Sequence, residues 1–463
     1  MSNKTEVSQP EPEPQARLDG ELDISFGTNG VVVINEPAVA LGINAVALEP
    51  ANNLEQRTYV ACTSSSTGAI WIVRLLEDGR LDEQFGEHGY AKLPSAGGTH
   101  GPLVPERFLF LESGHIIILG RALVLVGGQY LSMPATTRMT SDGVVDTSFG
   151  DGGYVVYQLP LPEDFNFAHA APVSNLEPEF ASALRSGQTR EQLSFCSGAS
   201  EILKDSLLLF VGSIKDEGDA HIASYVLKIT SDGSLDINYG LKGMVPVEDT
   251  TDSPARRTDC RHWDVDNKGA IVVAGINGTL GTSKTEAVVF KYDPSGVAEP
   301  GFGTSGVVHI SSPYEYNSQM RGVKVRDDKV IVLASFFTQP VINQNPAVIQ
   351  LTPGGTPDQS FNNGEPVILD LTPLAYLAFG IAIDAGNRIV ISGATNGIDV
   401  VEEAVATRLM PNGALDETFG VSGTVTFGGF GRALLAEMYS GVKPVGSAYK
   451  LSDSTPCVIR VIG

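Results

Sequence analysis

Short apolar runs separated by turn residues recur along the whole chain. Between residues 31 and 75 four such runs read VVVI, AVAL, YVAC and AIWIVRL. Between residues 307 and 351 the runs VVHI, GVKV, KVIVLAS and AVIQL repeat that order. Runs of this length that alternate or are continuously apolar predict β-strands. Asx-Gly turns such as Asp142-Gly143 follow the fourth run, so the pattern predicts units of four antiparallel strands.

One short phrase recurs seven times within this pattern. Its copies read LDISFGTNG, LDEQFGEHG, VDTSFGDGG, LDINYGLKG, AEPGFGTSG, PDQSFNNG and LDETFGVSG. The aromatic residues of the copies are Phe26, Phe85, Phe149, Tyr239, Phe302, Phe361 and Phe419. Successive aromatics are 59, 64, 90, 63, 59 and 58 residues apart. The interval of 90 indicates an insertion.

Charged residues keep fixed distances from this aromatic. An acid precedes it by three positions, at Asp23, Asp82, Asp146, Asp236, Glu299, Asp358 and Asp416. A mostly basic position precedes it by eleven, at Arg74, Arg138, Lys228, Lys291, Gln350 and Arg408. We expect the acid and the basic residue of each copy to form an ion pair. We expect the aromatic side chain to pack between neighbouring four-strand units. A calcium loop is the alternative, but one acid per copy supplies too few oxygen ligands.

The first copy lacks an upstream strand, and the C-terminus supplies one. The last run, PCVIRVI, places Arg460 in the basic position. This circularity predicts an all-β fold, a seven-bladed β-propeller with four antiparallel strands per blade. We expect contiguous four-strand units, with the N-terminal connector Leu22–Gly30 meeting the C-terminal strand. We further expect each phrase to join the outer strand of one blade to the inner strand of the next.

The repeated LDxSFGxxG phrase resembles the bacterial delta-60 repeat family, a β-propeller family of unknown function. The resemblance covers about residues 22–463. The sequence departs from the family pattern in the fifth copy of the phrase, AEPGFG, and in the sixth, PDQSFNNG. The family implies a propeller but no catalytic residues.

The domain organisation follows from the same pattern. Residues 1–17 are polar and proline-rich and predict a disordered tail, and residues 18–463 predict one propeller. An insertion of about 159–200 separates strands of the third blade. Since the N-terminus has no apolar signal region, we expect a cytoplasmic protein or one exported without a classical signal peptide.

The net charge of the chain limits the classes of partner that it can bind. The formal net charge is −23, from 54 acidic and 31 basic side chains. So acidic a surface repels phosphate backbones and anionic membranes, so we expect no nucleic-acid partner. No stretch approaches 18 consecutive apolar residues, so we expect no membrane insertion. We also expect a monomer.

Two departures from the repeat are candidate binding surfaces, because binding residues concentrate on loops. The insertion contains Asp164, Phe165, Phe167 and His169, and its stretch 177–193 favours a short helical cap. The segment 247–263, interpreted as a loop, contains Arg256, Arg257 and His262. The alternatives are that the insertion has no binding role and that the segment 247–263 is a solvated loop whose charges neutralise one another.

These features favour a non-catalytic binding or scaffold propeller that presents loops to a protein or glycan partner, without cofactor or metal. The chain has no HExxH, GxSxG or Walker-type motif. The alternative is an enzyme with a metal-assisted hydrolase, lactonase or lyase site at the mouth of the central channel. Glu36, Glu248, His309 and Asp370 are then the candidate groups. A lectin ranks lower, because the repeated aromatics are assigned to packing.

Overall fold

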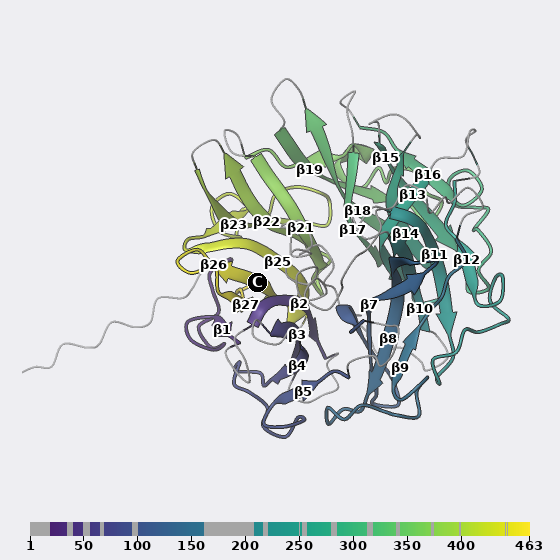
Figure 1. Ribbon diagram of the computed structural model, residues 1–463. Coiled ribbons are helices and arrows are strands. Elements are labelled where there is room, and N and C mark those ends of the chain that lie inside the picture. The colour runs from purple at the N-terminus through teal and green to yellow at the C-terminus, as the bar shows by residue number, and fades with distance from the viewer. Residues whose placement is uncertain are drawn as a thin grey trace, which may run out of the picture.

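The computed structural model describes residues 19–34, 40–49, 56–64, 69–94, 101–161, 208–215, 221–249, 251, 257–278, 285–312, 318–338, 343–371, 375–397, 400–439, 441 and 443–463. Within these residues the regular structure is β, apart from the 3-10 turn η2 (Asn362–Gly364). The sheets are arranged around a common centre as a propeller (Figure 1).

Four sheets each hold four strands that follow one another in the chain and pair antiparallel in that order. They are β2 (Ala40–Leu48), β3 (Thr58–Ser64), β4 (Ile70–Leu75) and β5 (Tyr90–Lys92); β13 (Arg257–Val265), β14 (Ile271–Gly278), β15 (Thr285–Tyr292) and β16 (Val307–Ile310); β17 (Ser318–Arg326), β18 (Lys329–Thr338), β19 (Asn343–Leu351) and β20 (Val367–Ile368); and β21 (Ala375–Ile383), β22 (Ile389–Gly397), β23 (Val400–Leu409) and β24 (Thr424–Phe427).

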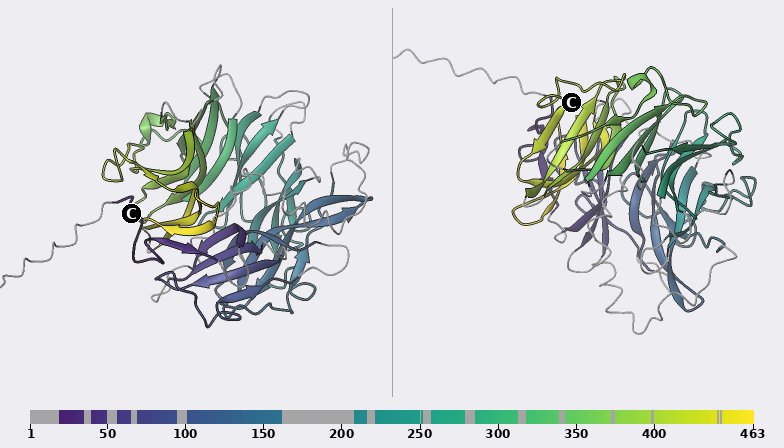
Figure 2. Two further views of the ribbon diagram at one scale, coloured as in Figure 1. Left: turned by 60° about the vertical axis from the view of Figure 1, so that its left-hand side comes forward. Right: turned by 90° about the horizontal axis from the view of Figure 1, so that it is seen from above.

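The two remaining sheets break this order. The closing sheet holds β25 (Phe430–Tyr439), β26 (Lys443–Lys450), β27 (Pro456–Arg460) and the N-terminal β1 (Val31–Val33). A seven-stranded sheet holds β6 (Val104–Phe110), β7 (Ile116–Val126), β8 (Gln129–Met139), β9 (Tyr154–Val156), β10 (Leu208–Lys215), β11 (His221–Ile229) and β12 (Met244–Pro246). Its longest strands, β7 and β8, extend past their neighbours (Figure 2).

The prediction of seven blades is wrong, because the described strands form six sheets. The difference lies at the interval of 90 residues. There β10 pairs with β8 at Lys215 and Ser132, so one sheet carries both the third and the fourth phrase. The other five sheets have four antiparallel strands each, as predicted. The insertion 159–200 lies outside the described residues beyond residue 161.

The predicted closure is confirmed in one respect and wrong in another. The N-terminal connector meets the C-terminal strand, with Leu22 bridged to Val461, but the last four-strand unit is not contiguous. The N-terminal β1 is the outer strand of the last sheet and pairs antiparallel with β27, with Val32 opposite Val458. The two strands lie side by side in Figure 1, in purple and yellow. The ring therefore closes by an exchanged strand, and the first contiguous blade begins at β2.

The position of the phrase shifts accordingly. In the four sheets whose strands follow one another in the chain, each phrase connects the third strand to the fourth, as Phe85 does between β4 and β5. In the seven-stranded sheet the two phrases connect β8 to β9 and β11 to β12. None of these phrases crosses to the next inner strand. The pattern had suggested the wrong boundary because the short strand after each phrase was counted as the start of a unit.

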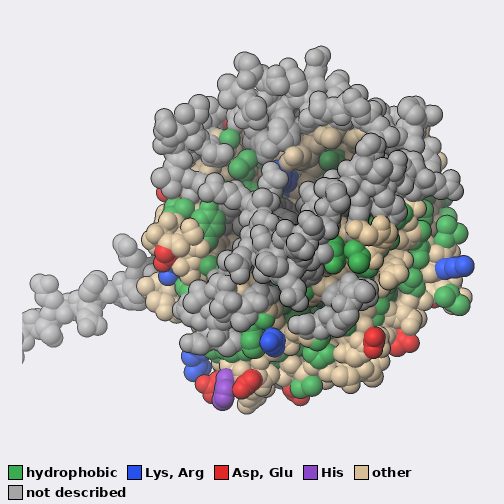
Figure 3. Space-filling view, in the orientation of Figure 1, with side chains coloured by type: hydrophobic (Ala, Val, Ile, Leu, Met, Phe, Trp, Pro, Cys, Tyr) green, Lys and Arg blue, Asp and Glu red, His purple; other side chains and the backbone are tan. Residues whose placement is uncertain are grey.

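Apolar side chains pack between adjacent sheets to form the core. One cluster joins Phe26 and Val458 of the closing sheet to Val60 and Val73 of the β2–β5 sheet. Charged side chains of the described residues lie mainly along the rim of the space-filling view (Figure 3). Among the described residues there is no helix of the length and hydrophobicity that crossing a lipid bilayer requires.

Candidate functional site

The repeated acid and basic residue meet in most copies of the phrase. In the second copy Arg74 Nε donates to Asp82 Oδ2 at 2.8 Å, and both side chains are 5% exposed. In the sixth copy Gln350 Nε2 donates to Asp358 Oδ2 at 2.9 Å. The same contact joins Arg138 to Asp146, Lys228 to Asp236, Arg408 to Asp416 and Arg460 to Asp23. In the fifth copy Lys291 lies instead 3.9 Å from Asp266.

The seven aromatic side chains are at most 1% exposed. The guanidinium of Arg460 lies 4.6 Å from the ring centre of Phe26, and that of Arg408 lies 4.7 Å from Phe419. The ring of Phe85 lies beside Gly143 in the turn of the next phrase, where a Cβ would come within 2.9 Å of it. The phrase residues thus hold neighbouring sheets together.

Backbone hydrogen bonds connect the phrases into a closed circle. The residue after each aromatic donates its N–H to a carbonyl in the turn of the next copy. The seven bonds run from Gly27 to Asp78, Gly86 to Asp142, Gly150 to Asp232, Gly240 to Ser295, Gly303 to Gly354, Asn362 to Asn412 and Gly420 to Asp19. The last bond joins the final copy to the N-terminal segment, so all phrases lie at one end of the ring, which we call the phrase end.

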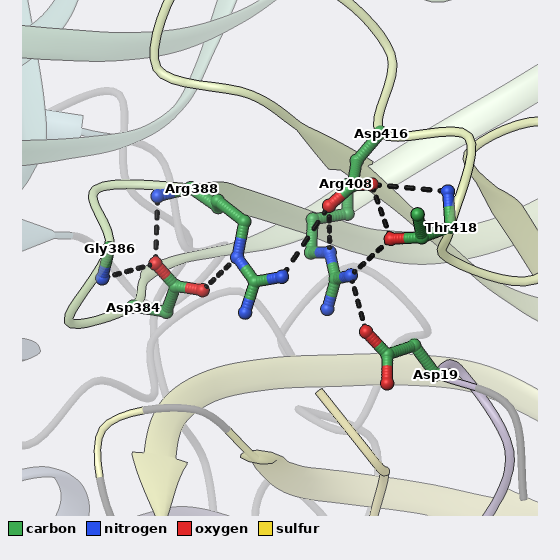
Figure 4. Close-up of polar contacts among 7 residues, drawn as sticks. All are labelled: Asp19, Asp384, Gly386, Arg388, Arg408, Asp416 and Thr418. Carbon is green, nitrogen blue, oxygen red and sulfur yellow. Dashed lines mark hydrogen bonds and ion pairs between the residues drawn. The ribbon is translucent and has the colours of Figure 1, made fainter.

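The N-terminal segment also enters an ion-pair network (Figure 4). Arg408 bonds to Asp416 at 2.8 Å and to Asp19 at 2.7 Å. Arg388 bridges Asp384 and Asp416. Burial alone would raise the pKa of Asp416, but hydrogen bonds from Thr418 and the charge of Arg408 outweigh it and lower this pKa.

A matching network lies where the two ends of the chain meet. Arg460 Nε and Lys443 Nζ contact Asp23 Oδ2 at 2.8 and 2.7 Å. Burial would raise the pKa of Asp23, but hydrogen bonds from Lys443 and Ser25 and the charge of Arg460 lower it to about 2. This carboxylate therefore stays ionised and ties β27 to the N-terminal phrase.

Most of the predicted binding residues fall outside the described part of the chain. Asp164, Phe165, Phe167, His169, Arg256 and Glu36 lie there. Arg257 begins β13, and its side chain is likewise outside the description. The segment 247–263 was predicted as a loop, but its last part, from Arg257 onward, belongs to the inner strand β13.

His262 lies half-buried on β13. Burial and the charges of Arg261 and Arg321 lower the pKa of its imidazole to about 4, so the ring is neutral at pH 7. Beside it, Arg107 of β6 lies 3.8 Å over the ring of Trp263 and donates to the Trp263 carbonyl at 2.9 Å. These contacts connect the inner strands of two sheets.

Three of the four candidates for acid–base or metal chemistry lie in the described part of the chain, and they lie on or just after strands of three different sheets. Glu248 and Asp370 are exposed on different sheets. His309 lies on β16, which is an outer strand rather than the predicted inner one. Among the described residues, no group of three or more His, Cys, Asp or Glu side chains is arranged to hold a metal ion.

His309 instead forms a cluster with residues that sequence reasoning had not selected. Its Nε2 lies 3.3 Å from Asp249 Oδ2 and 3.2 Å from Thr251 Oγ1. Its Nδ1 lies 3.2 Å from Glu286 Oε2. The Asp249 side chain is fully buried, whereas those of His309 and Glu286 are 28% and 33% exposed. We call Asp249, Thr251, Glu286 and His309 the His309 cluster.

Buried hydrogen bonds support this cluster from behind. Asn277 Nδ2 donates to Asp249 Oδ2 at 2.6 Å, and Thr258 Oγ1 donates to Asn277 at 2.9 Å. The Thr251 N–H and hydroxyl donate to the other Asp249 oxygen. Asp249 is therefore satisfied within the protein, and it fixes the orientation of His309.

The His309 cluster lies opposite the phrase end. Thr285 pairs with Gly278, and His309 pairs with Val288, at the end of the sheet away from the fifth phrase. The sequence signals for the cluster are faint: Asp249 lies in the acidic stretch VEDTTD, and Glu286 is one polar residue in a strand. Their proximity depends on strand register, which no local pattern encodes.

Comparison with known families gives a partial match. A β-propeller domain of unknown function (DUF5122) matches residues 326–361 and 387–419. Each matched segment runs to a phrase through the second and third strands of a sheet. This agrees with a propeller of unknown function, while the delta-60 resemblance stays a prediction. A search of curated proteins finds no match.

Solved structures resemble the chain only distantly. The NanB sialidase of Streptococcus pneumoniae is 10% identical with a TM-score of 0.41, over 93% of this chain and 70% of that one. An alpha-L-arabinofuranosidase of Fusarium graminearum is 9% identical with a TM-score of 0.43, over 94% and 97%. Sqt1 of Chaetomium thermophilum is 10% identical with a TM-score of 0.40, over 92% and 97%. Likenesses this distant carry no inference about activity.

Proposed function

We propose that the protein is a non-catalytic propeller that binds a glycan through the His309 cluster. The observation that carries the proposal is the fully buried Asp249. It holds the partly exposed His309, which in turn contacts the partly exposed Glu286. A polar pair anchored in this way is preorganised, so it loses little side-chain entropy when a ligand binds.

The chemistry of the cluster suits hydroxyl groups. A sugar hydroxyl both donates and accepts hydrogen bonds. Glu286 offers carboxylate oxygens that accept hydrogen bonds. The exposed Thr251 gives its hydroxyl proton to Asp249, so its oxygen is a further acceptor. Both nitrogens of His309 face a carboxylate, so in this arrangement the residue positions Glu286.

The aromatic residues support a polar mode of glycan binding. Those of the phrases are buried, and one face of Trp263 is covered by Arg107. We therefore expect hydrogen bonds, rather than repeated ring stacking, to hold the sugar.

The test is a titration of the full chain with a panel of linear neutral pentose and hexose oligosaccharides. Binding is followed by saturation-transfer NMR and calorimetry. For a panel member that binds, Glu286→Gln should weaken affinity roughly tenfold, since a charged acceptor is lost. Glu365→Gln, an exposed acid at the phrase end, is the matched control. Equal affinity in both variants, or no binding by any panel member, would overturn the proposal.

One observation favours a second function. A buried carboxylate beside an imidazole nitrogen is also how enzymes orient a histidine for acid–base catalysis. In that case the NMR samples would show cleavage of an oligosaccharide over time, and Asp249→Asn would abolish it. Intact oligosaccharides in every sample would exclude this alternative for the panel.

The insertion stays a predicted part of the partner surface. Leu159 is 4% exposed, and the Tyr225 hydroxyl donates to the Pro160 carbonyl at 2.8 Å. A deletion that tests the insertion should therefore begin after residue 161. We expect it to leave the ring folded and to abolish capture of the partner, whereas unchanged capture would remove the insertion from the site.

A further inference from the structure

Three positions in or directly before every phrase point outward. They stand five and two residues before the aromatic and two residues after it, and in all seven copies the residues there are exposed. Since the circle of hydrogen bonds places every phrase at one end, these positions form a single ring-shaped surface.

Large apolar side chains occupy many of these outward positions. The residues and their exposed fractions are Ile24 50%, Val144 61%, Ile237 74%, Leu241 70%, Val297 60% and Val421 83%. The fold does not require them, because other copies carry Thr147, Gln359, Thr304 or Asn363 at equivalent positions. Their packing role is already filled by the buried aromatic.

Acidic residues occupy other outward positions. They are Glu21, Glu83, Glu87, Asp151 and Glu417. The single base among these positions is Arg80, and it is paired with Asp78 at 2.6 Å. The surface therefore combines exposed apolar groups with a net negative charge.

The apolar side chains concentrate at the junction of the fourth and fifth phrases. There the Gly240 N–H donates to the Ser295 carbonyl. Ile237 and Leu241 flank the donor, and Val297 follows the acceptor by two residues. Exposed apolar groups gathered in this way mark binding surfaces.

We propose that the phrase end docks a partner protein whose contact surface combines Lys or Arg with apolar side chains. Charge complementarity selects this occupant, because basic groups pair with the acids while apolar groups cover the junction. A second copy of the chain is disfavoured, since each carries a net charge of −23.

A synthetic amphipathic Lys/Leu peptide is the probe, and its binding to the full chain is followed by fluorescence anisotropy. A Lys/Ser peptide and a Glu/Leu peptide of the same length are its controls. We expect the Lys/Leu peptide to bind more tightly than both. The triple variant Ile237→Ser, Leu241→Ser, Val297→Ser should bind it roughly tenfold more weakly or worse.

The matched control is Leu125→Ser, an exposed apolar residue at the other end of its sheet. This variant should bind as the wild type does. The acid variant Glu83→Gln, Glu87→Gln should bind more weakly and with a shallower dependence on salt. If the triple variant loses stability, Leu241→Asn, which copies Asn363 of the sixth phrase, replaces it.

Either of two results would overturn the proposal. One is equal loss of affinity in the Leu125→Ser and phrase variants. The other is equal affinity for the Lys/Leu and Lys/Ser peptides, which would reveal a purely electrostatic attraction. Because Glu286 lies at the opposite end, Glu286→Gln separates this surface from the proposed glycan site.

Discussion

At the residue scale, single carboxylates hold the phrases in place. Asp23 shows this most clearly, because it accepts hydrogen bonds from Arg460 of the last strand and from Lys443 at the start of β26. Its side chain is 7% exposed and that of Arg460 is 3% exposed. A buried charge of this kind is stabilising only while both partners are present.

Asp23→Asn should therefore lower the free energy of unfolding by about 3 kcal/mol at pH 7. The pKa of Asp23 falls on folding from its ordinary value of 3.8 to about 2. Its contribution is thus complete above about pH 4 and is lost as the pH falls toward 2. Urea unfolding at a series of pH values should show a flatter decline in this window for the variant.

Glu87→Gln, at an exposed position, is the control and should keep the wild-type dependence of stability on pH.

The sixth copy of the phrase suggests a milder substitution at the basic position, since Gln350 there holds Asp358 by one hydrogen bond. Arg460→Gln should therefore destabilise less than Arg460→Ala. Equal losses in these two variants would show that the contact with Asp23 contributes little.

At the element scale, a glycine turn receives the aromatic of the preceding phrase. Gly143 has φ +83°, and a Cβ there would lie 2.9 Å from both the Phe85 ring and the Gly86 nitrogen. Gly114 has a similar φ of +80° but no atom within 4 Å of a Cβ. The two glycines therefore separate backbone strain from contact between sheets.

Gly143→Ala should lower the free energy of unfolding by about 2–4 kcal/mol, from strain plus overpacking. Gly114→Ala should lower it by about 1–2 kcal/mol, from strain alone. Chemical denaturation of both variants measures the difference. If the losses are equal, the phrase does not hold adjacent sheets together in the way described.

The sequence repeat made part of this structure predictable. The strands, the buried aromatics and the pairing of Arg74 with Asp82 could be predicted, because each recurs at a fixed spacing in the chain. It could not place the phrase within a sheet, since the short strands such as β5 fit equally well at either boundary. The His309 cluster was hidden because Asp249 and Glu286 meet only through strand register and occur once.

At the scale of the whole molecule, the ring closes through residues from both ends of the chain. β1 pairs with β27, and the Gly20 N–H donates to the Ile462 carbonyl at 2.7 Å. Asp19 adds its contacts to Gly420 and Arg408. A chain trimmed to Leu22 would keep β1 but lose the contacts of Asp19 and Gly20. The N-terminal segment that closes the ring therefore begins at Asp19 rather than at the phrase.

The circular repeat indicated that the two ends meet, but not which strand crosses. The number of sheets could not be predicted from the sequence pattern either, because β10 pairs with β8 across a long non-repeating interval. Both differences concern long-range pairing, and the local sequence of each strand is compatible with either arrangement.

Closure by the exchanged N-terminal strand is the central claim, and truncation tests it most directly. Thermal unfolding by circular dichroism should be compared for the full chain and for chains that begin at residue 19 or at residue 35. We predict that the first truncation melts as the full chain does. The second should melt at a lower temperature and aggregate through the unpaired edge of β27, and a synthetic peptide of residues 19–34 should restore its stability. If the chain that begins at residue 35 melts as the full chain does, the N-terminal strand does not close the ring.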